Sequence, residues 1–127
     1  ENPTKIRLFL RTANTSGLFS HDSKYVHIAA YCANQQNRYW QFLDALMTKE
    51  KRWSENTIVT AAQEAQLNMV GWNNCRENDI SIGNTLLTLQ SAKDMGITKS
   101  PTIFINNKKI NPEIKINISK IIKELID

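Results

Sequence analysis

The two cysteines are the residues of this chain most suited to redox or metal chemistry. Cys32 and Cys75 lie 43 positions apart and belong to no Cys-x-x-Cys pair, so the local signatures of a redox dithiol and of a zinc site are both missing. The two histidines, His21 and His27, stand at no ligand-like spacing from either cysteine, which makes a metal site the weakest interpretation. Buried free thiols and one structural disulfide both remain open on composition alone.

The sequence around the two histidines does not indicate a catalytic role for either of them. Neither has a nearby carboxylate and a cysteine in a triad-like pattern. His21 stands beside Asp22 where a helix is expected to begin, and a capping or loop role suits it better than catalysis.

Length and charge favour one soluble domain. The 127 residues suit a single hydrophobic core, and the net charge of +4 is scattered along the chain, which is typical of a solvated surface rather than of a nucleic-acid footprint. No apolar run reaches the roughly 20 residues that a membrane span needs. The first four residues, Glu1 to Thr4, lack the basic start and apolar core of a signal peptide.

The spacing of apolar residues predicts a strand followed by helices. The apolar-rich run Ile6–Leu10 fits a strand, and Gly96 suits a left-handed cap at the end of the helical part. Ser54 is a good N-cap for a helix inside that part. The predicted helical segments are 20–33, 39–47, 54–65 and 79–95, with a further short turn or helix over 68–75.

A hairpin and a last helix are predicted after Gly96. Thr102–Ile105 is a β-branched and aromatic run, and Asn106-Asn107 tolerates the positive φ angles of a two-residue turn before a return strand over 108–110. Asn111-Pro112 then starts a helix. Its apolar stripe consists of Ile114, Ile118, Ile121, Ile122 and Leu125.

The segment from Gly96 to Ile110, which contains Lys99-Ser100-Pro101-Thr102, resembles the closing part of the DsbA-like thioredoxin superfamily. Members of that family close with a glycine, a small residue plus proline, a strand and an asparagine-containing turn. Two upstream segments agree with the resemblance: 31–40 looks like the helical insertion around a Cys-Ala and an aromatic pair, and 67–75 looks like its second cysteine turn. The resemblance covers residues 5 to 127.

The resemblance implies a fold and two sets of site residues. The fold class is α/β and thioredoxin-like, with 1–127 as a single partial domain, a helical insertion at about 22–95 and a closing β-β-α unit at about 96–127. Cys32 and Cys75 are implied to form a structural disulfide. Lys99, Ser100, Pro101 and Thr102 are implied to form the substrate-binding loop, with Pro101 in the cis form.

The chain departs from the family at its catalytic centre. No Cys-x-x-Cys stands at a helix start, although the family's chemistry needs one there. By its spacing to Cys32, the segment Ile6–Leu10 corresponds to the family's second strand, so the first strand and the catalytic helix have no counterpart. Three explanations compete: the chain is a fragment, a second copy donates a strand, or Ile6–Leu10 itself takes the central place in a smaller sheet.

The implied function is thiol-disulfide oxidoreduction, meaning disulfide formation or exchange in extracytoplasmic proteins of the periplasm, cell surface or secreted fraction. This chain alone is expected to be inactive, without cofactor or metal. The implied partners are extended cysteine-containing polypeptides or a chain that supplies the missing strand, and a strand-swapped homodimer is possible; neither nucleic acid nor a membrane span is expected. The alternatives are a non-catalytic peptide- or protein-binding module on a degenerate thioredoxin fold and a plain helical domain with no redox ancestry.

Overall fold

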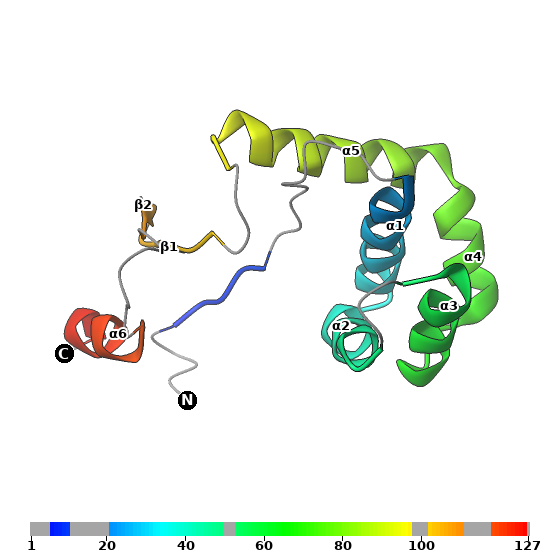
Figure 1. Cartoon of the computed structure of the whole chain (residues 1–127), viewed down its shortest axis with the longest axis horizontal. Coiled ribbons are helices and arrows are strands. Elements are labelled where there is room, and N and C mark those ends of the chain that lie inside the picture. The colour runs from blue at the N-terminus through cyan, green and yellow to red at the C-terminus, as the bar shows by residue number, and fades with distance from the viewer. Residues whose placement is uncertain (1–5, 11–20, 50–52, 98–101, 111–117, 127) are drawn as a thin grey trace.

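The computed structural model describes residues 6–10, 21–49, 53–97, 102–110 and 118–126. Helices α1 to α4 pack into a bundle, α5 runs away from that bundle, and a β-hairpin and a last helix lie beyond the far end of α5 (Figure 1). The helices of the first part are α1 (His21–Gln35), α2 (Tyr39–Met47), α3 (Glu55–Glu64), α4 (Met69–Glu77) and α5 (Asp79–Asp94).

Polar side chains start three of these helices. Ser54 Oγ accepts a hydrogen bond of 3.3 Å from the backbone N–H of Thr57, which confirms the predicted N-cap of α3. Asn68 and Asn78 cap α4 and α5 in the same way through their side-chain oxygens. Asn78 also ends α4, so α4 and α5 meet at one residue and form a corner without a linker.

The core of the bundle combines a few large side chains with many alanines. Trp72 on α4 and Phe42 on α2 are fully buried, with ring centroids 6.3 Å apart. The apolar side of α3 is buried, because its small residues let the neighbouring helices approach closely. Its members are Ile58, Ala61, Ala62 and Ala65.

Helix α5 is buried on only part of its surface. Thr85 and Leu89 are buried, whereas Leu86 and Met95, the residue that follows the helix, are 40% and 55% exposed. The end of α5 extends past the bundle, and none of the described helices covers it there (Figure 1). Gly96 has a φ of +72°, which confirms the predicted left-handed cap.

The sheet contains two antiparallel strands among the residues that the structure describes, β1 (Phe104–Ile105) and β2 (Lys108–Lys109). Phe104 pairs with Lys109 and Ile105 with Lys108.

The turn of this hairpin has the predicted form. Asn106 and Asn107 adopt φ angles of 48° and 65°, which asparagine tolerates better than most residues. The Ile110 N–H donates a 2.9 Å hydrogen bond to the Ile103 carbonyl and so extends the pairing beyond the two strands.

The strand predicted over Ile6–Leu10 is wrong. The described sheet has the order β1-β2 and does not include this segment, so the explanation that gave it the central place is wrong too. Its side chains are exposed, Leu8 by 74% and Phe9 by 72%. A strand forms only where its backbone N–H and C=O groups find a neighbouring strand, and sequence pattern does not supply that neighbour.

The last helix, α6 (Ile118–Ile126), is shorter in the described part of the chain than predicted, because its expected start lies in 111–117, outside the described residues. Ile121 and Ile122 are half-buried and Leu125 is 57% exposed. Among the described residues, none of the helices has the length and apolar character needed to cross a membrane.

Candidate functional site

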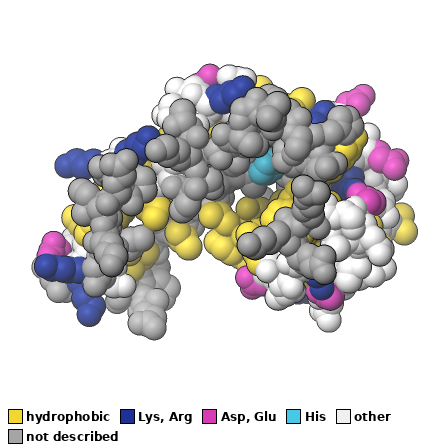
Figure 2. Space-filling model, in the orientation of Figure 1, with side chains coloured by type: hydrophobic (Ala, Val, Ile, Leu, Met, Phe, Trp, Pro, Cys, Tyr) yellow, Lys and Arg dark blue, Asp and Glu magenta, His cyan; other side chains and the backbone are white. Residues whose placement is uncertain are grey.

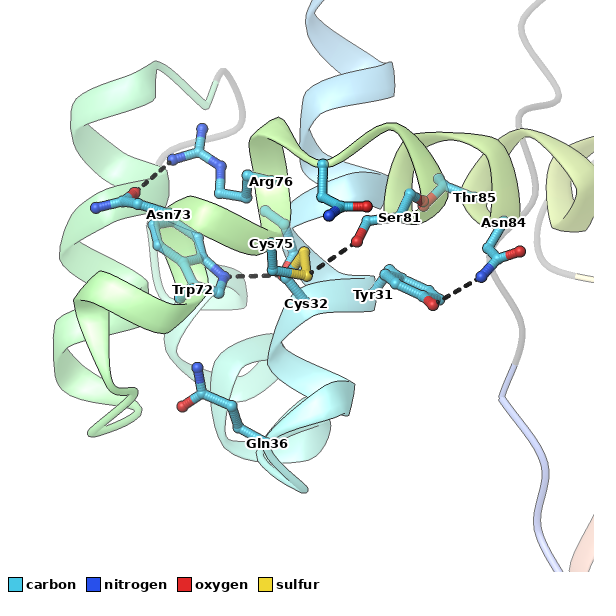
Figure 3. Close-up of a disulfide and its surroundings, with 12 residues drawn as sticks. Tyr31, Cys32, Gln36, Trp72, Asn73, Cys75, Arg76, Ser81, Asn84 and Thr85 are labelled. Carbon is cyan, nitrogen blue, oxygen red and sulfur yellow. Dashed lines mark hydrogen bonds between the residues drawn. A yellow bond between two sulfur atoms is a disulfide. The ribbon is translucent and has the colours of Figure 1, made fainter.

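The sulfurs of Cys32 and Cys75 are joined in a disulfide that links the last turn of α1 to the last turn of α4 (Figure 3). The Cα atoms are 5.8 Å apart. Cys32 is completely buried in the core, and Cys75 is half-buried. Neither residue stands at the start of a helix, where the backbone N–H groups would stabilise a thiolate, so the bond suits a structural cross-link more than a catalytic centre.

Neighbouring side chains hold α4 against this bond. The Trp72 indole N–H donates a 3.1 Å hydrogen bond to the Ala29 carbonyl of α1. The Arg76 guanidinium lies 4.4 Å from the centre of the Trp72 ring and donates from one nitrogen to both carboxylate oxygens of Glu55, each at 2.7 Å. The Cys75 Sγ is also 3.4 Å from the hydroxyl of Ser81, in the first turn of α5.

A cleft of about 590 Å³ is the second candidate site, and Figure 2 shows apolar side chains gathered in the hollow between the bundle and the hairpin end of the molecule. Among the residues that the structure describes, none of those lining the cleft is Asp, Glu, Lys or Arg. The cleft is lined by Leu8, Phe9, Leu10, His27, Tyr31, Asn34, Tyr39, Trp40, Thr85, Leu87, Thr88 and Ser91. Its volume lies in the range of small-ligand sites.

Burial keeps His27 and Tyr39 of this cleft uncharged near neutral pH. It lowers the pKa of His27 below the usual 6.5, so the imidazole is neutral at pH 7, and it raises the pKa of the Tyr39 phenol above 10.0. Tyr39 and Trp40 meet edge to face with centroids 5.7 Å apart. The Tyr31 hydroxyl accepts a 3.0 Å hydrogen bond from the Asn84 amide of α5, which links the α1 and α5 walls.

The cleft residues of α1 were not predicted as a site. His27, Tyr31 and Asn34 follow one another at spacings of four and three, which places them on one face of α1. That spacing was visible in the sequence, but a polar and aromatic face of this kind looks the same on an ordinary solvated helix.

The predicted substrate-binding loop is described only at its end. Lys99, Ser100 and Pro101, including the predicted cis bond of Pro101, lie outside the described residues. Thr102 is half-buried and lies in the segment that leads into β1.

The three tryptophans lie in different surroundings and form no common surface. Trp72 is core, Trp53 is half-buried, and Trp40 is 48% exposed in the cleft. The structure brings no cluster of three or more potential metal ligands together among the described residues.

The fold and the bridged helices define a mostly helical α/β domain with a small sheet and a disulfide between two helices. A family model for thioredoxin matches residues 3–124, nearly the whole chain, and the chain therefore belongs to the thioredoxin family. The alternative of a plain helical domain with no redox ancestry is accordingly wrong. Neither the curated proteins nor the solved structures include one that matches the chain.

Proposed function

We propose that the chain is the non-catalytic part of a DsbA-like thiol-disulfide oxidoreductase that forms or exchanges disulfides in extracytoplasmic proteins. The observation that carries the proposal is the family match over residues 3–124 in a chain whose two cysteines are both used in a bond between helices. No thiol remains for exchange chemistry while that bond is intact. Residues 1–127 alone are therefore expected to be inactive.

In this proposal the reaction passes through a mixed disulfide between a substrate cysteine and a Cys-x-x-Cys that this sequence does not contain. Ser100 and Pro101, by resemblance to the family, present the substrate as an extended strand, with Lys99 and Thr102 on either side. The partners are extended, cysteine-containing polypeptides.

Among the described residues no third strand pairs with the hairpin, and this supports the proposal that a strand is missing. A two-stranded hairpin is at best marginally stable in water, and here the apolar Ile103 and Phe104 are 38% and 37% exposed. We propose that a further strand pairs beside β1 and covers these side chains, supplied by another part of the same protein, a partner chain or a second copy. The truncated thioredoxin arrangement, without its first strand and catalytic helix, is part of the proposal.

The proposed compartment follows from the disulfide. Bonds of this kind persist in oxidising surroundings, so we place the protein in the periplasm, at the cell surface or among secreted proteins. Thiol titration of freshly isolated, unreduced protein under denaturing conditions tests this: no free thiol is expected, and two free thiols would count against both the compartment and the bond.

A non-catalytic peptide- or protein-binding module is the second candidate function. The uncharged, aromatic cleft beside α1 favours it, because such a site can bind an apolar polypeptide without any thiol chemistry.

The coding sequence before the Glu1 codon distinguishes the two candidates. A Cys-x-x-Cys some tens of codons upstream is expected for the oxidoreductase. A start codon or signal-cleavage site directly before Glu1 would overturn it and favour the module.

A further inference from the structure

The two sulfurs of the disulfide differ in how an incoming thiol can reach them. Cys32 is 0% exposed and belongs to the core cluster of the bundle, so its sulfur is shielded on all sides. Cys75 is half-buried near the end of α4, between the exposed Asn74 and the corner at Asn78. Thiol–disulfide exchange requires a thiolate to approach one sulfur in line with the S–S bond. The difference in burial therefore favours Cys75 over Cys32 as the residue that an incoming thiolate attacks.

Helix α4 is held to the bundle at three places besides the disulfide. At its start, Gln36 accepts a 2.8 Å hydrogen bond from the Asn68 backbone N–H and donates one of 3.2 Å to the Asn68 carbonyl. At its middle, the fully buried Trp72 is bonded to α1, and near its end Arg76 is paired with Glu55 of α3. Loss of the S–S bond consequently leaves the body of α4 attached.

What the bond holds in addition is the corner between α4 and α5. Cys75 stands two residues before the end of α4, Asn78 belongs to the ends of both helices, and Ser81 reaches back from the first turn of α5 to the Cys75 sulfur. Helix α5 carries one wall of the cleft. The residues of that wall are Thr85, Leu87, Thr88 and Ser91.

We propose that the Cys32–Cys75 disulfide is a one-sided redox latch on the α4–α5 corner. The thiolate of a small thiol or dithiol attacks the Cys75 sulfur, a mixed disulfide forms there, and the electron pair of the broken S–S bond leaves with Cys32, which then takes a proton. The second thiolate of the reductant attacks its own sulfur in the mixed disulfide and releases Cys75 as a thiolate, which is protonated in turn. The dithiol is oxidised to its disulfide, and the latch takes up two electrons and two protons.

Thiol–disulfide exchange at this bond is expected to be slow. The departing Cys32 thiolate forms in an apolar core that solvates an anion poorly, so exchange proceeds chiefly when the corner opens. Reduction removes the covalent link between α1 and the corner and leaves the Tyr31–Asn84 hydrogen bond between α1 and α5 in place, so the first turns of α5 gain freedom relative to α1 and the width of the cleft changes with them. The latch uses this chain's own cysteines and stands whether or not the proposed oxidoreductase function holds.

Trapping of the mixed disulfide tests the one-sidedness. Oxidised chain is incubated with excess reduced glutathione, quenched with acid and digested, and the glutathionylated peptide is identified by mass spectrometry. We expect Cys75 to carry the adduct at least about ten-fold more often than Cys32. Equal labelling, or labelling chiefly at Cys32, would overturn the proposal.

Hydrogen exchange of the wild-type chain, oxidised and reduced, tests the corner without any variant that could fail to fold. Reduction is expected to speed exchange about ten-fold or more over residues 75–91 while α1 to α3 keep their protection. Uniform loss of protection in all helices, or no change at the corner, would contradict the latch. The Cys32→Ala/Cys75→Ala variant is the matched control, because reductant should not alter its exchange.

Discussion

Opening the Cys32–Cys75 bond should lower the free energy of unfolding by a predictable amount. The bond closes a loop with a sequence separation of 43 residues, and the chain-entropy relation gives about 4 kcal/mol for a loop of that size at 25 °C. Small domains have a free energy of unfolding of about 5–15 kcal/mol, so the bond contributes a large share of the total stability. The effect lies mainly in the unfolded chain, which becomes less restricted when the bond is broken.

The measurement is urea unfolding followed by far-ultraviolet circular dichroism, on oxidised and on dithiothreitol-reduced chain. We expect the reduced chain to unfold at lower urea with a free energy about 4 kcal/mol smaller, and to retain its helical signal without urea, since α4 keeps its other attachments. The Cys32→Ala/Cys75→Ala variant should not respond to reductant. A difference below about 1 kcal/mol would refute the entropic argument, and loss of the helical signal on reduction alone would refute the independent attachment of α4.

Three further predictions concern single side chains. Gln36→Ala removes both hydrogen bonds to the start of α4 and should lower the free energy of unfolding in urea by about 1–2 kcal/mol. The same change at its exposed neighbour, Gln35→Ala, should lower it by less than about 0.5 kcal/mol. Equal losses would contradict the role of the Gln36 amide. Trp72→Phe loses the indole hydrogen bond and should cost about 1–2 kcal/mol, more than Trp40→Phe in the open cleft, and a larger effect at Trp40 would speak against the core assignment. The pKa of His27 is lowered by burial, so the unfolded chain binds the proton more readily; stability from this group is complete above pH 6.5 and falls as the pH drops below it. Between pH 7.5 and pH 5.5 the urea midpoint should therefore decrease more in wild type than in His27→Gln, and parallel pH profiles would count against a buried neutral imidazole.

Local features of this fold were predictable because their causes lie within a few residues. Ser54 caps α3, Gly96 ends the helical part, and Asn106-Asn107 makes the hairpin turn, each through conformations or hydrogen bonds that neighbouring residues determine. The helices of the bundle follow from apolar spacing for the same reason.

Features that depend on distant partners were not predictable. Ile6–Leu10 has the composition of a strand, but strand formation requires a neighbour that composition does not reveal. Leu86 is exposed although Thr85 and Leu89, on either side of it along α5, are buried, and Met95 is exposed just after the helix ends, because apolar spacing does not reveal which positions a neighbouring helix covers.

The candidate site also contains features that the sequence alone could not predict. Composition left free thiols and a disulfide open for Cys32 and Cys75, and the family resemblance was needed to favour the bond that joins α1 and α4. The cleft requires three separate parts of the chain to meet, so the spacing of His27 and Tyr31 along α1 could not identify it in advance.

The most direct test of the central claim is insulin reduction driven by dithiothreitol in the presence of residues 1–127. Both cysteines of this chain form the bond between α1 and α4, and in the proposed function the catalytic dithiol lies outside residues 1–127. We expect no increase in the rate of insulin reduction over dithiothreitol alone. Sustained turnover by residues 1–127 would contradict the proposed function, because the catalytic thiols would then have to be Cys32 and Cys75 themselves.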